Sequence, residues 1–342
     1  MKGAFRALLS LLLLAAPAAV QAQSGSGDDF DYTINSQDTN TITITEYTGT
    51  NTVVAIPTNI NSLLVTGIGN GQTFVFGTNL TSITIPGGAT GIAGYAFAYC
   101  FNLSSVTIPD TVTSIGSNAF FLCFNLAGVT IPNSVTNIGS AAFEECLSLS
   151  SVTIPDTVTS IGTEAFCQSA SLTNVTIPAS VTSIGAEAFC QSTSLASVTI
   201  PDSVTSIADF AFAACFGLTT VYFEGNAPTA DSTVFAYDNN LTIYYLPGAA
   251  GWDSFSANTG ITPVLWDPLG PSGDASVGVQ NNQFGFNFTG PASLLIVVQA
   301  CTDLASPVWT PLLTNALSNG SFSFSDPQWT NYSGRFYRIS SP

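Results

Sequence analysis

The sequence predicts a mainly β protein: a solenoid of 23-residue coils with a cap at each end, followed by a small antiparallel β-sandwich. A leucine recurs every 23 residues through seven intervals without insertion or deletion. Each leucine of the regular coils opens a β-branched run that ends at proline, which cannot donate to a strand ladder. Near the C-terminus the pattern changes to alternating phenylalanines and turn signals. The periodic leucines are Leu80, Leu103, Leu126, Leu149, Leu172, Leu195, Leu218 and Leu241.

Each position of the repeated unit has a predicted role. The unit reads SVTIPDTVTSIG at Ser105–Gly116 and again, letter for letter, at Ser151–Gly162. Its Val-Thr-Ile run is expected to form one parallel strand per coil, about 4.8 Å from the next, with valine and isoleucine inward. An Ala-Phe pair adds a buried phenylalanine to each coil. The glycine that ends the quoted segment is alanine at Ala93 and Ala208, which indicates tight packing rather than a left-handed backbone.

The period and the L-x-x-V-x-I opening are the signature of a leucine-rich solenoid. The complete unit, LxxVTIPxSVTxIGxxAFxxCxxL, resembles the BspA-type leucine-rich repeat of bacterial secreted and surface proteins across residues 53–266. That resemblance implies a binding scaffold, because the family is associated with adhesion and with recognition of host or environmental macromolecules. It implies no particular partner.

Two N-terminal segments are predicted from the position of charged residues and from the alternation of polar and β-branched residues. Residues 1–22 are predicted to be a signal peptide: Lys2 and Arg6 precede a short apolar run, and Val20-Gln21-Ala22 matches a cleavage site. Residues 23–52 alternate polar and β-branched side chains and are expected to form an N-terminal β cap before the repeats of residues 53–266.

The C-terminal segments differ from the repeats in composition. Residues 267–274 are rich in proline and glycine and are predicted to be a linker. Residues 275–342 are expected to form the β-sandwich, which resembles C-terminal modules of secreted multidomain bacterial proteins. Its two arginines are expected to pair with nearby acids; the four residues are Arg335, Arg338, Asp303 and Asp326.

The charge balance excludes several functions. The chain has 4 Lys+Arg, 21 Asp+Glu and no histidine, for a net charge of −17 at pH 7. Nucleic acid is excluded as a partner because binding needs cations against phosphates. Histidine-based catalysis and histidine-ligated zinc are excluded as well. After the signal peptide no apolar run is long enough to cross a membrane, so we expect a secreted or cell-surface protein. We also expect a monomer without a cofactor or a metal ion.

The seven cysteines leave two interpretations open. Four share one column of the repeat with Ser169 and Ser192, and two share a second column. The resemblance implies a ladder of small buried side chains, whereas secretion would also permit disulfides between neighbouring coils. A spacing of 23 residues is not a metal-ligand spacing. The first column contains Cys100, Cys123, Cys146 and Cys215; the second contains Cys167 and Cys190; Cys301 belongs to the C-terminal segment.

Carboxylates are the remaining acid–base groups. Glu164 and Glu187 occupy equivalent positions on adjacent coils, so their side chains are expected about 5 Å apart, the separation used by retaining glycosidases. The alternative is two exposed acids on the convex surface without a cleft. A row of aspartates in every second coil is read as a solvated polar row, with weak calcium binding as the alternative. These are Asp110, Asp156 and Asp202.

The expected concave face supplies the candidate binding residues. Serine and threonine flank the inward valine of each strand and form a neutral hydroxyl lattice. A soluble sheet surface explains the same pattern, since threonine favours strands, and a water-ordering face of the ice-binding kind is a further alternative. The predicted binding residues are Thr107, Thr130, Thr153, Thr176, Thr199 and Tyr222.

An aromatic cluster near the end of the repeats is read as the seal of the open solenoid edge, with a binding site as the alternative. Its members are Tyr222, Phe223, Tyr237, Tyr244, Tyr245 and Trp252.

The sequence therefore predicts a non-enzymatic binding or adhesion scaffold that recognises an extracellular protein or polysaccharide. Two alternatives remain: a spacer that displays the C-terminal module, and a glycan hydrolase acting through Glu164 and Glu187.

Overall fold

The computed structural model describes most of the chain between Gln23 and Ser340. The predicted signal peptide and the predicted linker lie outside the described residues. The described residues are 23–24, 27–69, 71, 73–74, 77, 79–246, 248–265, 278–280, 283–289, 295–302, 309–317, 321–332 and 335–340.

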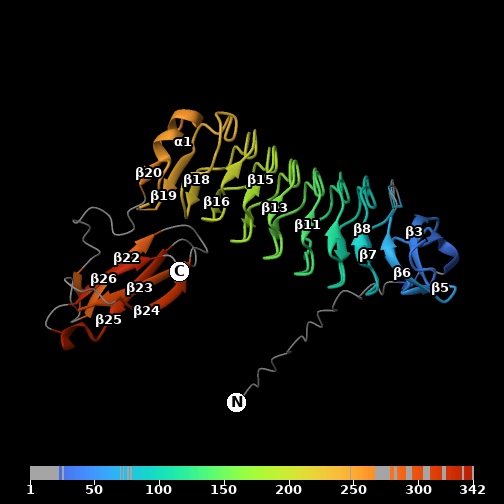
Figure 1. The fold of residues 1–342 in the computed structure, drawn as a ribbon, viewed down its shortest axis with the longest axis horizontal. Helices are drawn as coiled ribbons and strands as arrows, with labels where there is room; N and C mark the ends of the chain where they lie inside the picture. The colour runs from blue at the N-terminus through green and yellow to red at the C-terminus, as the bar shows by residue number, and fades with distance from the viewer. Residues whose placement is uncertain are drawn as a thin grey trace, which may run out of the picture.

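The fold is mainly β, and its largest part is a solenoid of 23-residue coils stacked side by side (Figure 1). One row of parallel strands comes from the L-x-x-V-T-I segments, as predicted from the sequence. Its members are β1 (Gln23–Ser24), β4 (Val53–Ala55), β7 (Ser82–Thr84), β9 (Ser105–Thr107), β12 (Ser151–Thr153), β14 (Asn174–Thr176), β16 (Ser197–Ile200), β18 (Thr220–Phe223), β19 (Thr242–Tyr245) and β20 (Val264–Leu265).

A second row of short parallel strands, which the sequence analysis did not predict, comes from a Ser-Ile, Asn-Ile or Gly-Ile dipeptide later in each coil. These strands are only two residues long because the chain turns immediately afterwards. They are β8 (Gly91–Ile92), β10 (Ser114–Ile115), β11 (Asn137–Ile138), β13 (Ser160–Ile161), β15 (Ser183–Ile184) and β17 (Ser206–Ile207).

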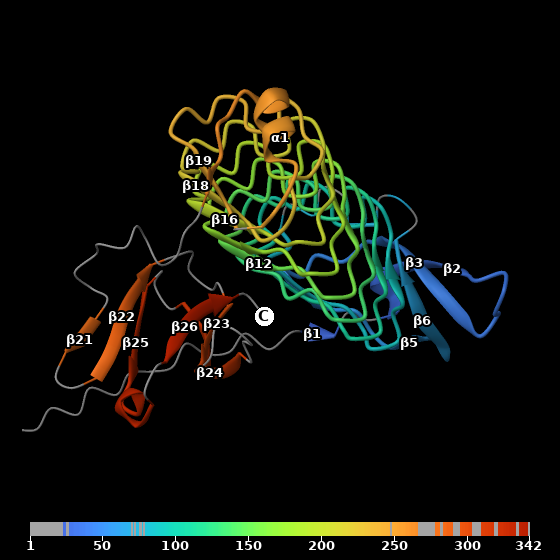
Figure 2. The ribbon, with the colours of Figure 1, turned by 60° about the vertical axis from the view of Figure 1, so that its left-hand side comes forward.

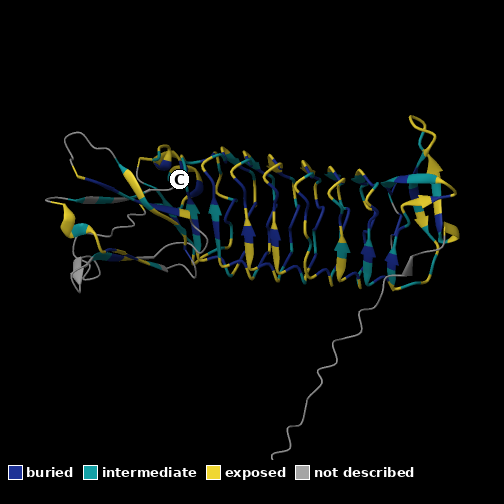
Figure 3. Ribbon diagram, turned by 90° about the horizontal axis from the view of Figure 1, so that it is seen from below, coloured by how far each residue is buried: buried dark blue, intermediate teal, exposed yellow. Residues whose placement is uncertain are grey.

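Parallel pairing places equivalent residues of successive coils directly beside one another. Thr153 pairs with Thr176 in the β12–β14 register, 23 positions later. Every position of the unit therefore becomes a column along the solenoid, and Figure 3 shows dark, buried columns alternating with exposed ones. The expectation of one strand per coil is wrong at Gly128, which keeps only an isolated bridge to Ser105. Glycine weakens a strand because it has no side chain to pack.

Phenylalanine rings fill the centre of the solenoid. The ring of Phe143 lies 5.2 Å from that of Phe120 and 5.5 Å from that of Phe166, both nearly parallel to it. The tight packing predicted for the glycine column is confirmed. A Cβ at Gly139 would lie 2.4 Å from the backbone nitrogen of Ser117. The stacked rings are Phe97, Phe120, Phe143, Phe166, Phe189, Phe212 and Phe235.

The turns beside these rings hold non-glycine residues in the left-handed backbone region, usually two in each coil. Glu164 has a φ of 58° and Gln168 a φ of 57°. The conformation costs free energy for a residue with a Cβ. Hydrogen bonds between coils hold it in place: the N–H of Glu164 donates to the carbonyl of Ala186 over 2.8 Å.

Both ends of the solenoid differ from its middle. The N-terminal end begins with η1 (Gly27–Asp29). An antiparallel hairpin follows, formed by β2 (Phe30–Ile34) and β3 (Thr41–Tyr47). Strand β3 joins the second row by pairing with β6 (Leu63–Ile68), which also pairs with β5 (Asn59–Ile60). Tyr47 stacks on Phe74 and extends the ring column.

At the other end of the solenoid lies α1 (Trp252–Thr259), visible beside the last coils in Figure 2. Its Trp252 packs against Phe223 and Tyr245 and covers the apolar end of the last coils. Within the described part of the chain, no helix is long and apolar enough to cross a membrane.

The C-terminal region contains two three-stranded antiparallel sheets. Side chains from both sheets share one hydrophobic cluster, in which Phe286 and Phe324 meet Ile296 and Val298. The strands are β21 (Gly278–Gln280), β22 (Gln283–Thr289) and β25 (Ser321–Asp326) in one sheet, and β23 (Leu295–Cys301), β24 (Thr310–Ala316) and β26 (Phe336–Ser340) in the other; η2 (Trp329–Asn331) follows β25.

Of the expected ion pairs in this region, the structure shows Arg335 with Asp326 at 3.1 Å. The hydroxyl of Tyr337 also donates to Asp326, over 2.8 Å. Asp303 and the side chain of Arg338 lie outside the described residues.

Candidate functional site

The six predicted binding residues form a single column along the first row of strands, which we call the strand face. Thr107, Thr130, Thr153 and Thr176 are exposed, whereas Thr199 and Tyr222 are half-buried. Within the described residues, no hydrogen bond engages the five threonine hydroxyls of this column. They therefore remain available to a ligand, and their role in binding stays a prediction.

Most other serine and threonine columns are occupied by hydrogen bonds between coils. Thr113 donates to the carbonyl of Thr90 over 3.1 Å, and Thr136 donates to that of Thr113 over 3.3 Å. In a further column, Ser134 donates to the carbonyl of Val112 over 2.6 Å. These hydroxyls add hydrogen bonds between coils; the carbonyls of Thr90 and Thr113 also accept the backbone N–H of the next coil. The abundance of hydroxyl residues is therefore mainly structural, and the strand face is an exception.

The strand face ends in aromatic residues. Thr199 pairs in register with Tyr222, which pairs with Tyr244. The two tyrosine rings are stacked, with centroids 5.3 Å apart. The last strand, β20, adds Val264, which pairs with Tyr244 and is 45% exposed; Leu265, which is 50% exposed, pairs with Tyr245 in the neighbouring column. A neutral hydroxyl column thus runs into a half-buried aromatic and apolar patch.

The structure divides the predicted aromatic cluster into three parts. Phe223, Tyr245 and Trp252 pack together in the cap, as the sealing interpretation expected. Tyr222 and Tyr244 belong to the strand face. Tyr237 is 69% exposed and lies in a turn of the last coil.

The first cysteine column is a buried ladder of free thiols. Each Sγ donates to a phenylalanine carbonyl of the preceding coils: Cys123 to Phe97 over 3.2 Å, and Cys146 to Phe120 over 3.4 Å. Ser169 takes the same position and donates to Phe143. Burial raises the pKa of Cys100 to about 12 and raises that of Cys123, Cys146 and Cys215 as well. These thiols are unreactive packing groups.

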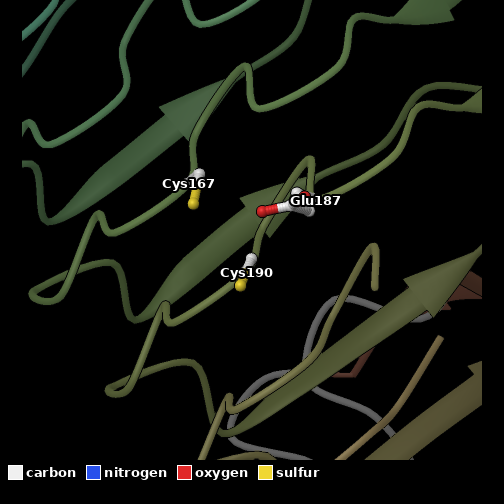
Figure 4. Close-up of side chains that lie close together, drawn as sticks. All are labelled: Cys167, Glu187 and Cys190. Atoms are coloured by element: carbon white, nitrogen blue, oxygen red, sulfur yellow. The ribbon is translucent and has the colours of Figure 1, made fainter. Parts of the chain in front are cut away.

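The second cysteine column differs because its thiols lie next to a carboxylate. Cys167, Glu187 and Cys190 place their ligand atoms within 4.8 Å of one another (Figure 4). A hydrogen bond between the two thiols raises the pKa of Cys167 and lowers that of Cys190. The sequence analysis dismissed the spacing of 23 residues as a ligand spacing; stacking of the coils brings the groups together nonetheless.

Glu144 stands one coil before Cys167 in the same column and was missed by the sequence analysis. Burial, followed by repulsion from Glu164, Glu145 and Glu187, raises the pKa of Glu144 to about 7. The signal was present in the sequence, because counting 23 residues back from Cys167 reaches this glutamate.

The remaining carboxylates behave differently from one another. Glu164 and Glu187 are half-buried rather than exposed, and both stand in left-handed turns. Asp110, Asp156 and Asp202 are exposed, as a solvated row requires. Among the described residues, they join no group of three or more potential metal ligands.

Asp238 ends the first cysteine column, 23 residues after Cys215, and was also missed. It stands where the other members donate to a carbonyl, which an ionised carboxylate cannot do. Burial raises the pKa of Asp238 to about 7.

The stacked coils, the ring column and the two rows of short parallel strands define a leucine-rich-repeat solenoid. The family model of the BspA type leucine rich repeat region matches six copies, over residues 66–192 and 159–259. The chain belongs to this family.

The chain is also similar to solved leucine-rich repeat structures. The T. pallidum leucine rich repeat protein is 27% identical, with 59% of this chain and 86% of that chain covered and a TM-score of 0.46. A leucine-rich repeat protein from Bacteroides ovatus is 22% identical, covering 64% and 70%, with a TM-score of 0.39. A leucine rich cell surface protein from Faecalibacterium prausnitzii is 24% identical, covering 69% and 97%, with a TM-score of 0.32. No curated protein matches the sequence.

Proposed function

We propose that the protein is an extracellular, non-enzymatic binding scaffold whose strand face recognises an extended neutral partner, either a polysaccharide or a protein segment. The observation that carries the proposal is the strand face itself: five threonine hydroxyls without a partner, aligned in one column that ends at the stacked pair of Tyr222 and Tyr244.

The geometry supports an extended ligand. Neighbouring strands lie about 4.8 Å apart, so the column offers hydrogen-bonding groups at regular intervals along one line. The only charged groups that the chain has in quantity are acidic, and none occurs in this column, so affinity comes from hydrogen bonds and ring contacts. Stacked tyrosines add an amphipathic surface of the kind that anchors sugars or apolar side chains. A polyanion is disfavoured by the net charge of −17.

The test is a screen of the full-length processed chain on glycan and extracellular-protein arrays, followed by variants against each hit. The double substitution Thr153→Lys with Thr176→Lys places two long cations on the strand face, and we expect binding to fall at least about 10-fold, which corresponds to about 1.4 kcal/mol. Tyr222→Thr tests the aromatic end and is expected to weaken the same ligand.

The matched control is Asn133→Lys with Ala179→Lys. Both residues are exposed and each lies three positions after the strand-face threonine of its coil, so the pair adds the same charge outside the strand face. If this control weakens binding as much as the strand-face pair, the site is wrong. If a ligand binds all variants equally, the repeats act as a spacer for the C-terminal sheets, which is the second candidate function.

Secretion and surface location belong to the proposal. They are supported by the family and by the predicted signal peptide of residues 1–22. We expect the secreted chain to begin at Gln23, which N-terminal sequencing measures. A mature chain that begins at Met1 contradicts the processing.

A further inference from the structure

At the second cysteine column, three potential metal ligands from two adjacent coils lie close together. This is the one such group among the described residues. Glu187 and Cys190 belong to the same turn, three residues apart, and Cys167 belongs to the preceding coil (Figure 4). Cys167 is 3% exposed and Cys190 is 7% exposed, so both sulfur atoms are largely withdrawn from water. Glu187 is half-buried beside them.

The geometry of the group is close to that of a tetrahedral site. With zinc–sulfur bonds of about 2.3 Å, two coordinated sulfurs lie roughly 3.8 Å apart, and the three ligand atoms here already lie within 4.8 Å of one another. Metal binding requires rotations of the three side chains that bring these atoms closer together. The stacking of the solenoid holds the two cysteines in register, so the site is organised before a metal arrives.

The other cysteine column shows why this group is special. Cys100, Cys123, Cys146 and Cys215 are buried in the same way, but each donates to a backbone carbonyl, and among the described residues none joins a group of three potential metal ligands. Cys167 and Cys190 instead interact with each other. A carboxylate with two thiols is a donor set for a thiophilic cation, because calcium and magnesium prefer oxygen ligands alone.

We propose that Cys167, Glu187 and Cys190 form a binding site for one thiophilic divalent cation of the zinc type. Binding replaces the two thiol protons, which pass to solvent, and the sulfurs bind as thiolates. The fourth position is open to water or to the carboxylate of Glu144, which occupies the same column one coil earlier. The bound ion joins two adjacent coils and stabilises the middle of the solenoid. The inference is independent of ligand binding at the strand face.

The experiment uses the full processed chain, reduced and freed of metal. Zn²⁺ is titrated by calorimetry, and Co²⁺ is added as a spectroscopic probe whose charge-transfer absorption reports sulfur ligands. We expect one Zn²⁺ per chain, an increase in melting temperature on binding, and a Co²⁺–thiolate band. Cys167→Ala and Cys190→Ala are expected to abolish the band and to lower affinity at least about 100-fold; Glu187→Gln is expected to lower it about 10-fold.

The repeat itself supplies folded controls. The alanines that follow in the same column, Ala213 and Ala236, show that the position accepts alanine. Cys123→Ser removes a thiol from the other column, where Ser169 and Ser192 already stand, and is expected to leave affinity, stoichiometry and the band unchanged. Circular dichroism of each variant checks that the solenoid is intact.

Three results would overturn the proposal. The first is zinc binding that survives both cysteine substitutions, which would place the ion among the surface acids. The second is no binding by the reduced wild-type chain. The third is isolation of the secreted chain with a Cys167–Cys190 disulfide, seen as an intact mass lower by two hydrogen atoms, because a cystine does not ligate as two thiolates.

Discussion

The central coils and the C-terminal coils of the solenoid use the same columns for different chemistry. In the centre, the columns carry stacked Phe143 and its neighbours, a glycine such as Gly139 that admits close backbone contact, and hydroxyls or thiols that donate to carbonyls. Towards the C-terminal end, the glycine column carries Ala208, the first cysteine column carries Asp238, and the strand-face threonine column carries the ring of Tyr222.

This difference distinguishes the residues that packing requires from those that are free to recognise a partner. A coil with a neighbour on both sides must repeat that neighbour's shape, so its sequence is held constant. A coil near the end has fewer such contacts and can change. The residues that depart from the column pattern, among them Tyr222, Asp238 and the Cys167–Cys190 pair in the middle, are therefore the ones whose function packing does not explain.

The largest expected effect is on the ring column. Phe143 is fully buried and stacked on both sides, so Phe143→Ala is expected to lower the free energy of unfolding by about 3–5 kcal/mol. Phe235→Ala, near the end, removes a ring stacked on Phe212 and is expected to cost less. Urea denaturation of both variants measures the difference. Equal losses would show that the end coil packs as tightly as the centre.

The next effect concerns the glycine column. Gly139→Ala places a Cβ 2.4 Å from the nitrogen of Ser117, and the coil must shift, which we expect to cost about 1–3 kcal/mol. At the end of the solenoid the same column already holds Ala208, so Ala208→Gly serves as the reverse control with a cost below about 1 kcal/mol. Thermal unfolding compares the two, and a neutral Gly139→Ala would refute close contact as the reason for glycine.

Replacing Asp238 by serine makes the last coil resemble the centre. The pKa of Asp238 is raised from 3.8 to about 7 by burial, so the folded chain binds this proton more readily than the unfolded chain. Stability should therefore rise as pH falls from about 7 towards 4, the interval between the two pKa values, and should change little above pH 8. Because the side chain is only partly withdrawn from water, we expect the gain to be about 1 kcal/mol.

Asp238→Ser should raise stability at pH 8 by about the same amount and reduce the pH dependence, as measured by urea denaturation at pH 5 and pH 8. Glu144, whose pKa is also raised to about 7, accounts for the pH dependence that remains. Asp110→Asn, which removes one exposed negative charge elsewhere, is the control and should retain the pH dependence. A variant at position 238 that keeps the wild-type pH profile would assign that profile to another group.

The smallest effect repairs the one irregular strand of the centre. Gly128 interrupts the first row, and a Cβ there would meet no atom within 4 Å. Gly128→Ser reproduces the residue found at Ser105 and Ser151 and is expected to raise stability by up to about 1 kcal/mol. Thermal unfolding checks the sign. A loss of stability would mean that the interruption itself is required at this coil.

The solenoid could be predicted almost completely from the sequence, because each coil buries the same side chains at the same positions as the next coil. A period of 23 residues, once found, assigns Leu103, Val112 and Phe120 to the core and Thr107 to the surface, and the structure agrees. The second row of strands was missed because a two-residue strand leaves no alternation to detect. The left-handed turns were missed because Glu164 and Gln168 lack the usual glycine signal.

The candidate sites needed the tertiary structure for a different reason. Spacing along the chain alone could not show whether Cys167 and Cys190 touch each other, face a carboxylate or donate to a carbonyl, since both cysteine columns have the same period. Nor could it separate the hydroxyls that hold coils together from those of Thr153 and Thr176 that remain free. The sequence determined the repeat, because the burial of identical side chains against one another is periodic. Only the tertiary structure decided which polar groups are already satisfied, because that depends on the direction of each side chain across neighbouring coils.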